Sequence, residues 1–352
     1  RVEDAFSHIA HINIEAETLL SDNKTTCYRN KAQYPVSFDR QLKIGFFAPR
    51  SHRVVDCENC ILQPPIFADI VKIFRKFIIK NGITVYDSEK HTGLLRHIYL
   101  RLAEATGEVM VCAVINGEDL PHKDELIEKL TEIPSVKSIV LNINRDRTNV
   151  ILGKECVTVW GNDCIYDVLC GVKVRLSPLS FYQVNHDMAQ QLYEKAAEYA
   201  CLSGKETVLD MYCGTGTIGL SMAKKAKRII GAEIVPEAVL DAKRNALENG
   251  IENAEFICAD AGEAAQELSS RGIKPDVVLL DPPRKGCSEM LLAEIVKMSP
   301  ERIVYVSCDP STLARDCFRL KDLGYETKRL AAADLFPRTV HVESVALLTK
   351  QK

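Results

Sequence analysis

The stretch Leu209-Asp-Met-Tyr-Cys-Gly-Thr-Gly-Thr-Ile-Gly219 joins a short apolar segment to a glycine-rich turn. The apolar segment is typical of a buried strand, and the residues that follow Gly219 are typical of a helix. Gly214 and Gly216 permit the tight turn between them and let a ligand approach the backbone closely. This strand–turn–helix unit predicts a cofactor site at the start of an α/β domain.

From Asp187 onward, segments of helical and strand character alternate along the chain. The expected helices are 188–200, 219–226, 236–249, 262–271, 290–297 and 311–323. The expected strands are 207–212, 228–234, 254–259, 276–280, 302–306, 325–332 and 342–348. Such alternation predicts a Rossmann-like, doubly wound sheet that binds its ligands at the carboxyl ends of the strands.

The first half of the chain has a different pattern. It begins with a helical segment over residues 2–21, continues with hairpin-like strand pairs and contains an amphipathic helix over residues 65–80. This mixture predicts an α+β fold. We therefore expect a smaller α+β domain over residues 1–178 and an α/β catalytic domain over residues 179–352.

The composition is that of a globular protein, with 46% hydrophobic and 26% charged residues. No run of about 18 apolar residues is present, so no membrane-spanning helix is expected. Thirteen scattered cysteines favour a reducing compartment, and we expect the cytoplasm. Cys57 and Cys60 have metal-ligand spacing, but no second close pair completes a tetrahedral site.

The net charge of −3 hides a basic region. Residues 23–101 hold 14 Lys or Arg and six Asp or Glu, a net charge of +8. A local excess of this kind is the usual footprint of a phosphate backbone. Solvated helix and hairpin faces explain the charge count equally well.

The segments at the ends of two further strands indicate the cofactor. Glu233 follows Gly216 by 17 residues, where an acid accepts hydrogen bonds from ribose hydroxyls. Gly219 also fits the third glycine of a dinucleotide fingerprint, so the glycines alone leave NAD open. Leu280-Asp-Pro-Pro-Arg-Lys-Gly286 is an acid–Pro–Pro turn that resembles those of S-adenosylmethionine-dependent methyltransferases, and a rigid turn fixes the acid at the cleft.

Five motifs in order along the chain resemble one family, the RNA 5-methyluridine (uracil-C5) methyltransferases. They are Ser180–Asn185 (SFYQVN), Asp210–Gly219, Asp281–Gly286 (DPPRKG), Ser307–Asp316 (SCDPSTLARD) and Leu335–Leu348 (LFPRTVHVESVALL). The first half is consistent through Tyr28–Lys31 (YRNK) and Gly93–His97 (GLLRH). The resemblance implies a class I S-adenosylmethionine-dependent methyltransferase fold in the second half of the chain.

The resemblance also implies a role for individual residues. Cys308 corresponds to the thiolate that adds to C6 of uracil, and Glu343 to the general base that removes the C5 proton. The expected cofactor-binding residues are Gln183, Tyr212, Glu233 and Asp281. Asp260 is a weaker candidate for the adenine edge, and His341 is expected to orient a turn rather than to act as a base.

This chemistry explains why a cysteine is needed. C5 of uracil is a poor nucleophile, and addition of a thiolate to C6 converts C5 into an enolate carbon that attacks a methyl group. A stacked base cannot react, so the RNA has to present an unstacked uridine, and the basic first region is expected to hold the RNA backbone. Without the resemblance, Cys308 is interpreted as a structural thiol and Glu343 as an edge-strand acid.

Two features of many relatives do not precede Arg1, an RNA-binding β-barrel domain and a cysteine cluster that holds a [4Fe-4S] centre. Val55–Cys60 resembles the segment that supplies the fourth cluster ligand, with Cys60 the better match. The resemblance therefore implies an N-terminally truncated member of the iron–sulfur 23S rRNA (uracil-5-)-methyltransferase branch. A cluster is expected only in the untruncated protein.

We expect an RNA substrate, 23S rRNA before the T-loop of tRNA, and a monomer that does not bind membranes. A second enzyme class, methyltransferases that act on exocyclic amines, usually has an aromatic residue after the Pro-Pro, where this chain has Arg284. A different class is an RNA-binding or RNA-folding protein with an inactive methyltransferase domain. The presence of Cys308, Glu343 and the cofactor positions weighs against it.

Overall fold

The computed structural model describes residues 1–351, which form two compact units. The methyltransferase-like unit consists of Arg1–Lys24, Leu169–Val174 and the chain from Asp187 onward. The second unit consists of Thr25–Val168 and Arg175–His186. Both units are thus built from separate segments, which differs from the single boundary predicted after residue 178.

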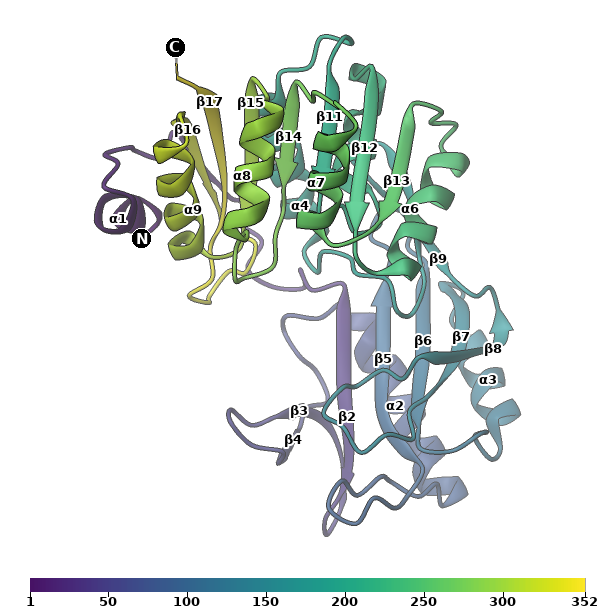
Figure 1. The fold of residues 1–352 in the computed structure, drawn as a ribbon. Helices are drawn as coiled ribbons and strands as arrows, with labels where there is room; N and C mark the ends of the chain where they lie inside the picture. The colour runs from purple at the N-terminus through teal and green to yellow at the C-terminus, as the bar shows by residue number, and fades with distance from the viewer. Residues whose placement is uncertain (352) are drawn as a thin grey trace. The chain divides into compact units, whose positions relative to one another are not determined.

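The first unit contains an eight-stranded sheet that is parallel except for β17 (Figure 1). β17 is inserted between β15 and β16 and runs antiparallel to both. In sheet order the strands are β1 (Leu19–Leu20), β16 (Tyr325–Ala333), β17 (Glu343–Lys350), β15 (Arg302–Ser307), β14 (Val277–Leu280), β11 (Thr207–Met211), β12 (Arg228–Glu233) and β13 (Ala254–Cys258). The predicted Rossmann-like α/β fold is confirmed.

The helices of this unit alternate with its strands, as their 3.6-residue apolar period predicts. They are α4 (His186–Ala200), α5 (Thr217–Met222) with the 3₁₀ turn η2 (Ala223–Lys225), α6 (Pro236–Glu248), α7 (Ala261–Ser270), α8 (Glu289–Met298) and α9 (Pro310–Asp322). In Figure 1, α7, α8 and α9 lie on one face of the sheet and α4 on the other. Pro236 and Pro310 occupy the first turns of α6 and α9, where the missing N–H has no intrahelical partner to lose.

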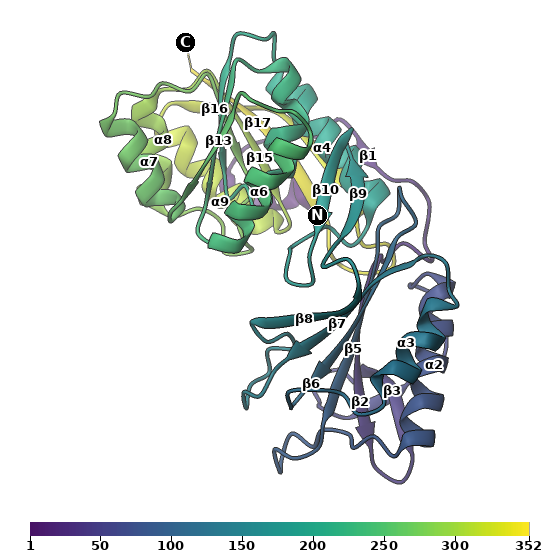
Figure 2. The same ribbon diagram turned by 90° about the vertical axis from the view of Figure 1, so that its right-hand side faces the viewer.

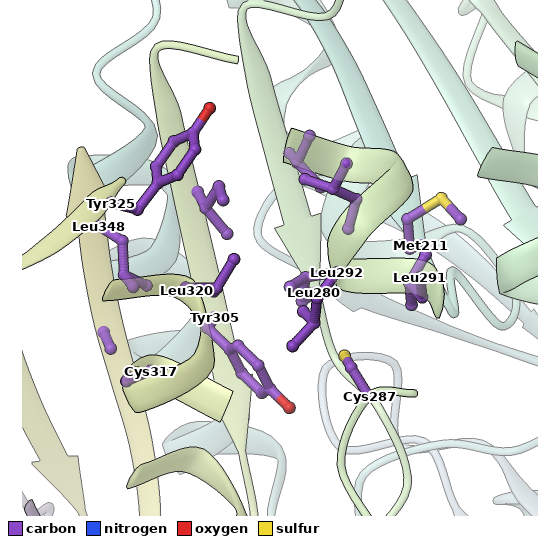
Figure 3. Packing of buried hydrophobic residues seen from close by; sticks show 14 of the residues in the cluster. Met211, Leu280, Cys287, Leu291, Leu292, Tyr305, Cys317, Leu320, Tyr325 and Leu348 are labelled. Carbon is purple, nitrogen blue, oxygen red and sulfur yellow. The ribbon is translucent and has the colours of Figure 1, made fainter. Parts of the chain in front are cut away.

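The core between the sheet and α7–α9 is continuous and fully buried. Leu280 and Tyr305 from β14 and β15 pack with Leu291, Leu292 and Leu320 from α8 and α9, as Figure 3 shows. This packing fixes the carboxyl ends of β14 and β15, from which the functional loops emerge.

The N-terminal helix is shorter than predicted over residues 2–21. α1 (Val2–Ala5) and one π-helical turn, η1 (Phe6–Ala10), end at His11, whose φ is +51°. Phe6 and Ala10 join the core of the α9 side, but the next apolar residues, in β1, extend the sheet in parallel with β16. Pairing with a sheet edge therefore overrides the helical pattern there.

The second unit is an α+β domain with a seven-stranded sheet. Its strands in order are β4 (Val54–Asp56), β3 (Leu42–Phe47), β2 (Lys31–Phe38), β5 (Leu95–Leu102), β6 (Val109–Ile115), β7 (Val136–Ile143) and β8 (Glu155–Gly161). β6 and β7 are parallel and are joined through α3 (Lys123–Thr131), while the other pairs are antiparallel. α3 and α2 (Pro65–Asn81) pack on the same side of the sheet (Figure 2).

A short hairpin, β9 (Ile165–Leu169) and β10 (Val172–Leu176), precedes α4. Throughout residues 1–351, no helix combines the length and the apolar character that crossing a bilayer requires.

Candidate active site

The glycine-rich turn after β11 forms a tight loop over the sheet. Gly214 and Gly216 have φ of +54° and +80°, and Gly216 is the N-cap of α5. A Cβ at Gly216 would lie 3.0 Å from the Phe256 ring, so a larger residue would force the ring to shift. Tyr212 also has a left-handed φ of +64°, a strained conformation for a residue with a side chain. The loop is held in a shape that few other residues permit.

Glu233, at the end of β12, is positioned by that loop. Its carboxylate accepts hydrogen bonds from the N–H groups of Gly214 (3.1 Å) and Val235 (2.9 Å). These two bonds fix the carboxylate at the carboxyl end of the sheet, where the remaining lone pairs of its oxygens suit ribose hydroxyls.

Asp210, inside β11, is the buried acid beneath the loop. Its Oδ2 accepts from the N–H of Gly219 at 2.9 Å, while Oδ1 is buried without a hydrogen-bond partner among the described residues. Burial, together with the charges of Asp281 and Glu233, raises the pKa of Asp210 to about 7, although the hydrogen bond from Gly219 opposes the shift. An unsatisfied buried oxygen beside an open glycine loop fits a bound ligand that carries a donor or a positive charge.

Asp281 begins the acid–Pro–Pro turn directly after β14. Burial raises the pKa of its carboxyl group to about 7. Burial disfavours the ionised form of this carboxyl group, so a cationic ligand beside it, such as a sulfonium, would stabilise the carboxylate.

Asp316, on α9, anchors the other end of that turn. Its fully buried carboxylate accepts from the N–H of Cys287 (2.8 Å) and the hydroxyl of Tyr305 (2.7 Å) on Oδ2. Arg315 and Arg319 donate to Oδ1 at 3.0 and 3.3 Å. Asp316 thus joins the turn, β15 and α9 in one network, a role that was not predicted from the sequence.

Cys308 and Glu343 emerge from adjacent antiparallel strands. Ser307, the last residue of β15, pairs with Ser344 of β17, so the next residues outward are Cys308 and Glu343. Cys308 is half-buried, and Glu343 is 5% exposed. Directly opposite residues of an antiparallel pair have Cα atoms about 5 Å apart. The sheet therefore brings the two side chains together at the carboxyl end of β15.

The turn after Cys308 is rigid. Ser307 Oγ accepts from the N–H of Asp309 at 3.1 Å, and Asp309 caps α9 by accepting from the N–H groups of Ser311 and Thr312. Pro310 then fixes the first turn of the helix. These contacts hold the thiol at the carboxyl end of β15.

The electrostatics of Cys308 and Glu343 are coupled. Burial, and then the charge of Asp281, raises the pKa of Glu343 to about 8, while the charge of Arg284 opposes the shift. Burial and the charge of Glu343 raise the pKa of Cys308, and Arg284 lowers it by its charge and a hydrogen bond. Arg284 Nη2 also lies 3.3 Å from Nδ1 of His341, so His341 orients the guanidinium.

The remaining predicted residues lie at separate places. Tyr212 packs against the core beside the loop, and Asp260 caps α7 by accepting from the N–H of Gly262 at 2.9 Å. Gln183 belongs to the second unit, where Asn30 Nδ2 donates to its carbonyl at 3.0 Å. The structure thus groups Cys308, Glu343 and Asp281 with Arg284, and Tyr212 and Glu233 with the glycine loop.

Two residues of the site were not among the predicted ones. Asp210 lies inside the quoted motif, but only its burial and its unpartnered oxygen single it out. Asp316 lies within the stretch after Cys308, and an acid in an amphipathic helix gives no signal that it is buried. In residues 1–351, no group of three or more His, Cys, Asp or Glu side chains is placed to hold a metal ion, so Cys60 and its neighbours alone form no cluster site.

An α/β sheet with a glycine loop, an acid held by that loop at the end of β12 and an acid–Pro–Pro turn after β14 defines a class I S-adenosylmethionine-dependent methyltransferase. The family described as tRNA (Uracil-5-)-methyltransferase matches residues 170–351. The chain belongs to this family and is an RNA uracil-5-methyltransferase that uses S-adenosylmethionine.

Relatives of known sequence and structure agree with this family. The chain is 47% identical to an uncharacterized RNA methyltransferase of Clostridium tetani, over 99% of this chain and 76% of the relative. It is 46% identical to another from Halalkalibacterium halodurans, over 99% and 77%. The crystal structure of the tRNA (uracil-54, C5)-methyltransferase of Pyrococcus abyssi, in complex with S-adenosyl-L-homocysteine, is similar with a TM-score of 0.83. It is 30% identical and covers 99% of this chain and 82% of that one.

Proposed function

We propose that this protein methylates C5 of a specific uridine in RNA through a covalent bond between Cys308 and C6 of the base, with Glu343 as the general base. The observation that carries the proposal is the register of β15 and β17, which sets a thiol beside a buried carboxyl group. A nucleophile and a base within reach of one reacting base are what the reaction requires.

The Cys308 thiolate forms a bond to C6, and the C5=C6 electron pair moves toward C5 and O4. C5 then forms a bond to the methyl group that bound S-adenosylmethionine would supply, while the bond between that group and the sulfonium sulfur breaks and leaves its electron pair on sulfur. The Glu343 carboxylate then takes the C5 proton, the electron pair restores C5=C6, and the Cys308–C6 bond breaks to release the thiolate.

The other residues of the site bind and orient. Glu233 is proposed to accept from the ribose hydroxyls, Tyr212 to flank the adenosyl group, and Asp281 to face the methyl donor. Gln183 is proposed to bind the cofactor, as the family resemblance implies. Arg284 is proposed to stabilise the Cys308 thiolate before the RNA binds, because it is the cation that lowers the pKa of that thiol.

An RNA that contains 5-fluorouridine at the target position tests the mechanism. Fluorine cannot leave C5 as a proton does, so the wild-type protein with S-adenosylmethionine should form a stable protein–RNA adduct at Cys308. C308A should form none while it still binds the RNA. An adduct in C308A, or none in the wild type, would show that the mechanism is wrong.

For the RNA itself we propose 23S rRNA, because Val55–Cys60 resembles the cluster-binding segment of the rRNA branch. The tRNA T-loop is the second candidate, because the similar solved structure is a tRNA (uracil-54, C5)-methyltransferase. Mapping 5-methyluridine in rRNA and tRNA of cells with and without the gene distinguishes the two. We further propose that the protein acts as a monomer in the cytoplasm.

An RNA-folding protein without catalysis is the alternative of another class. It predicts RNA binding that does not depend on Cys308 or Glu343, and no change in 5-methyluridine when the gene is removed. The raised pKa of Glu343 and the coupling of its charge to Cys308 favour the enzyme, because perturbed groups of this kind cluster at active sites.

A further inference from the structure

One face of the seven-stranded sheet in the second unit is not covered by α2 or α3. Ala32 and Tyr34 of β2, and Ile98 and Leu100 of β5, pack in the core beneath these helices. Alternate residues of a strand point to opposite faces, so the residues between them belong to the other side of the sheet. We call it the helix-free face, and its members on β2 and β5 are Lys31, Gln33, Pro35, His97, Tyr99 and Arg101. Figure 2 shows both helices on the opposite side.

Positive charge is concentrated at one end of this face. Lys31 pairs in register with Arg101, which is 2% exposed and donates to the carbonyls of Ser177 and Ser180 at 2.9 and 2.7 Å. Burial, followed by the charges of Arg101 and Arg29, lowers the pKa of Lys31 to about 8. Lys31 has no hydrogen-bond or ion-pair partner in the part of the chain that the structure describes. A half-buried lysine beside two arginines and no acid is a favourable place for an anion.

An exposed aromatic ring lies at the other end. Phe47, the last residue of β3, is 43% exposed, whereas its neighbour Phe46 packs toward the core against Tyr34. The rings of His97 and His52 meet Phe47 nearly edge-on, at centroid distances of 6.3 and 5.8 Å and interplanar angles of 74° and 79°. Two such contacts fix the orientation of the Phe47 ring.

His97, beneath that ring, is an unsatisfied polar group. Both of its ring nitrogens are buried and lack a partner among the described residues. Burial, and then the charge of Arg96, lowers the pKa of His97 to about 4, so it is neutral under physiological conditions. A neutral imidazole packs against Phe47 without repelling a base that stacks on the exposed part of the ring.

The cations around Phe47 differ from those on the helix side of the same unit. Arg50 and Arg53, in the loop between β3 and β4, have no acidic partner among residues 1–351. On the helix side most cations are paired, in Lys72–Asp69, Arg75–Asp56 and Lys80–Glu125, although Lys76 of α2 has no ion pair among the described residues. Lys31, Arg50 and Arg53 therefore leave positive charge without an acidic partner on and beside the helix-free face, where it complements a phosphate backbone.

Pro35, Tyr99 and Arg101 of the helix-free face are buried, so its accessible part runs from Lys31 and Gln33 to Phe47. From these contacts, and resting on the proposed function, we infer that this accessible part binds an unpaired segment of the RNA substrate, with Lys31 at a phosphate and Phe47 stacked on a base. The segment is single-stranded because stacking on a side chain requires a base whose face is free. Duplex RNA presents its phosphates but not the faces of its bases, so it would use the charges without the ring.

Binding of a short single-stranded RNA of mixed sequence, containing one 5-fluorouridine, tests the role of Phe47. F47A should weaken binding by roughly ten- to a hundredfold, the usual range for loss of one stacked base. The matched control is F38A, because Phe38 ends β2 in the same hairpin, is 68% exposed and has no ring neighbour among the described residues. F38A should bind as the wild type does, and F47W should restore binding. An equal loss in F38A and F47A, or no loss in F47A, would overturn the inference.

The salt dependence of binding tests the role of Lys31. K31M should reduce the slope of log affinity against log salt concentration by about one unit, as removal of one phosphate contact does. K72M is the control, because Lys72 is paired with Asp69 on the helix side. A slope unchanged by K31M, or a loss in F47A that is as large for a duplex RNA, would exclude this binding mode.

Covalent adduct formation at saturating RNA separates the two proposals. F47A should still form the adduct on Cys308 once the RNA is saturating, because Phe47 takes no part in the chemistry. Adduct formation in the wild type with no binding defect in F47A would contradict only the inference that the helix-free face binds RNA. If the wild type forms no adduct but F47A, unlike F38A, binds RNA more weakly, the result would support RNA binding by the helix-free face and contradict the proposed chemistry.

Discussion

Ser307 of β15 lies opposite Ser344 of β17 in an antiparallel pair. This register determines the site, because the residues immediately outward are Cys308 and Glu343. Asp281 leaves the neighbouring strand β14 at the same end of the sheet, and its charge raises the pKa of Glu343. A thiol, the buried carboxyl group of Glu343 and the partly buried one of Asp281 therefore meet where β14 and β15 end and β17 begins.

Replacing Glu343 by Gln should separate the two halves of the reaction. E343Q keeps the size and polarity of the side chain but cannot accept the C5 proton, so the methylated base should remain bonded to Cys308. We expect turnover to fall by about 10²–10⁴-fold, the usual contribution of a general base. Denaturing gels with natural RNA should show an adduct that carries the labelled methyl group. Turnover near that of the wild type would exclude Glu343 as the base.

The strands and helices of the methyltransferase sheet were predictable because each of these elements depends on a local sequence pattern. The β11–α5 turn needs glycine at left-handed φ, and Glu233 follows it at the spacing of a nucleotide-binding strand. The pairing of Cys308 with Glu343 was not derivable in this way. It depends on the insertion of β17 between β15 and β16, and no local pattern specifies which strand lies beside which. Only the family resemblance pointed to the pair.

Two other features show where local patterns fail. Asp316 lies on an amphipathic helix, and its burial depends on Tyr305 and the Cys287 amide, which come from other elements. Leu19 and Leu20 continue an apolar pattern that predicts a helix, yet they pair with β16 because an open sheet edge is available there. Both outcomes are decided by tertiary contacts.

The rate should rise with pH across the neutral range. Glu343 acts as a base only when it is ionised, and its pKa is raised to about 8. The pKa of Cys308 is also raised, so the thiolate fraction increases in the same direction. A profile of kcat/KM against pH should therefore increase across the neutral range and continue to rise above pH 8, because the pKa of Cys308 is also raised; a profile that falls over the neutral range would contradict the assignment.

Replacement of Arg284 tests the cause of that profile. The charge of Arg284 lowers the pKa of both Glu343 and Cys308, so R284M should shift the rise in kcat/KM to higher pH. The loss should be largest at neutral pH and partly recovered in alkaline buffer. H341A is the matched variant, because His341 contacts Arg284 and should produce a smaller shift in the same direction. Equal losses at every pH would indicate that Arg284 only positions the RNA.

Removal of the Asp316 carboxylate should destabilise the turn that carries Asp281. D316A leaves the hydroxyl of Tyr305 and the guanidinium groups of Arg315 and Arg319 without their acceptor. Loss of such a buried, charged acceptor costs about 2–4 kcal/mol. Thermal unfolding should show a lower midpoint, and the affinity for S-adenosylmethionine should fall. D322A, at the exposed end of the same helix, should change neither.

Gly216 should tolerate no side chain if the loop binds the cofactor. G216A places a methyl group 3.0 Å from the Phe256 ring in a backbone with φ of +80°. G250A is the matched control, because Gly250 has φ of +62° and no atom within 4 Å of the added Cβ. Both variants carry the cost of a left-handed residue, about 1–2 kcal/mol. Only G216A has to displace Phe256 and with it the loop.

Calorimetric titration with S-adenosylmethionine should therefore show about tenfold weaker binding for G216A, equivalent to about 1.4 kcal/mol, and unchanged binding for G250A. Equal affinities in the two variants would place the cofactor elsewhere.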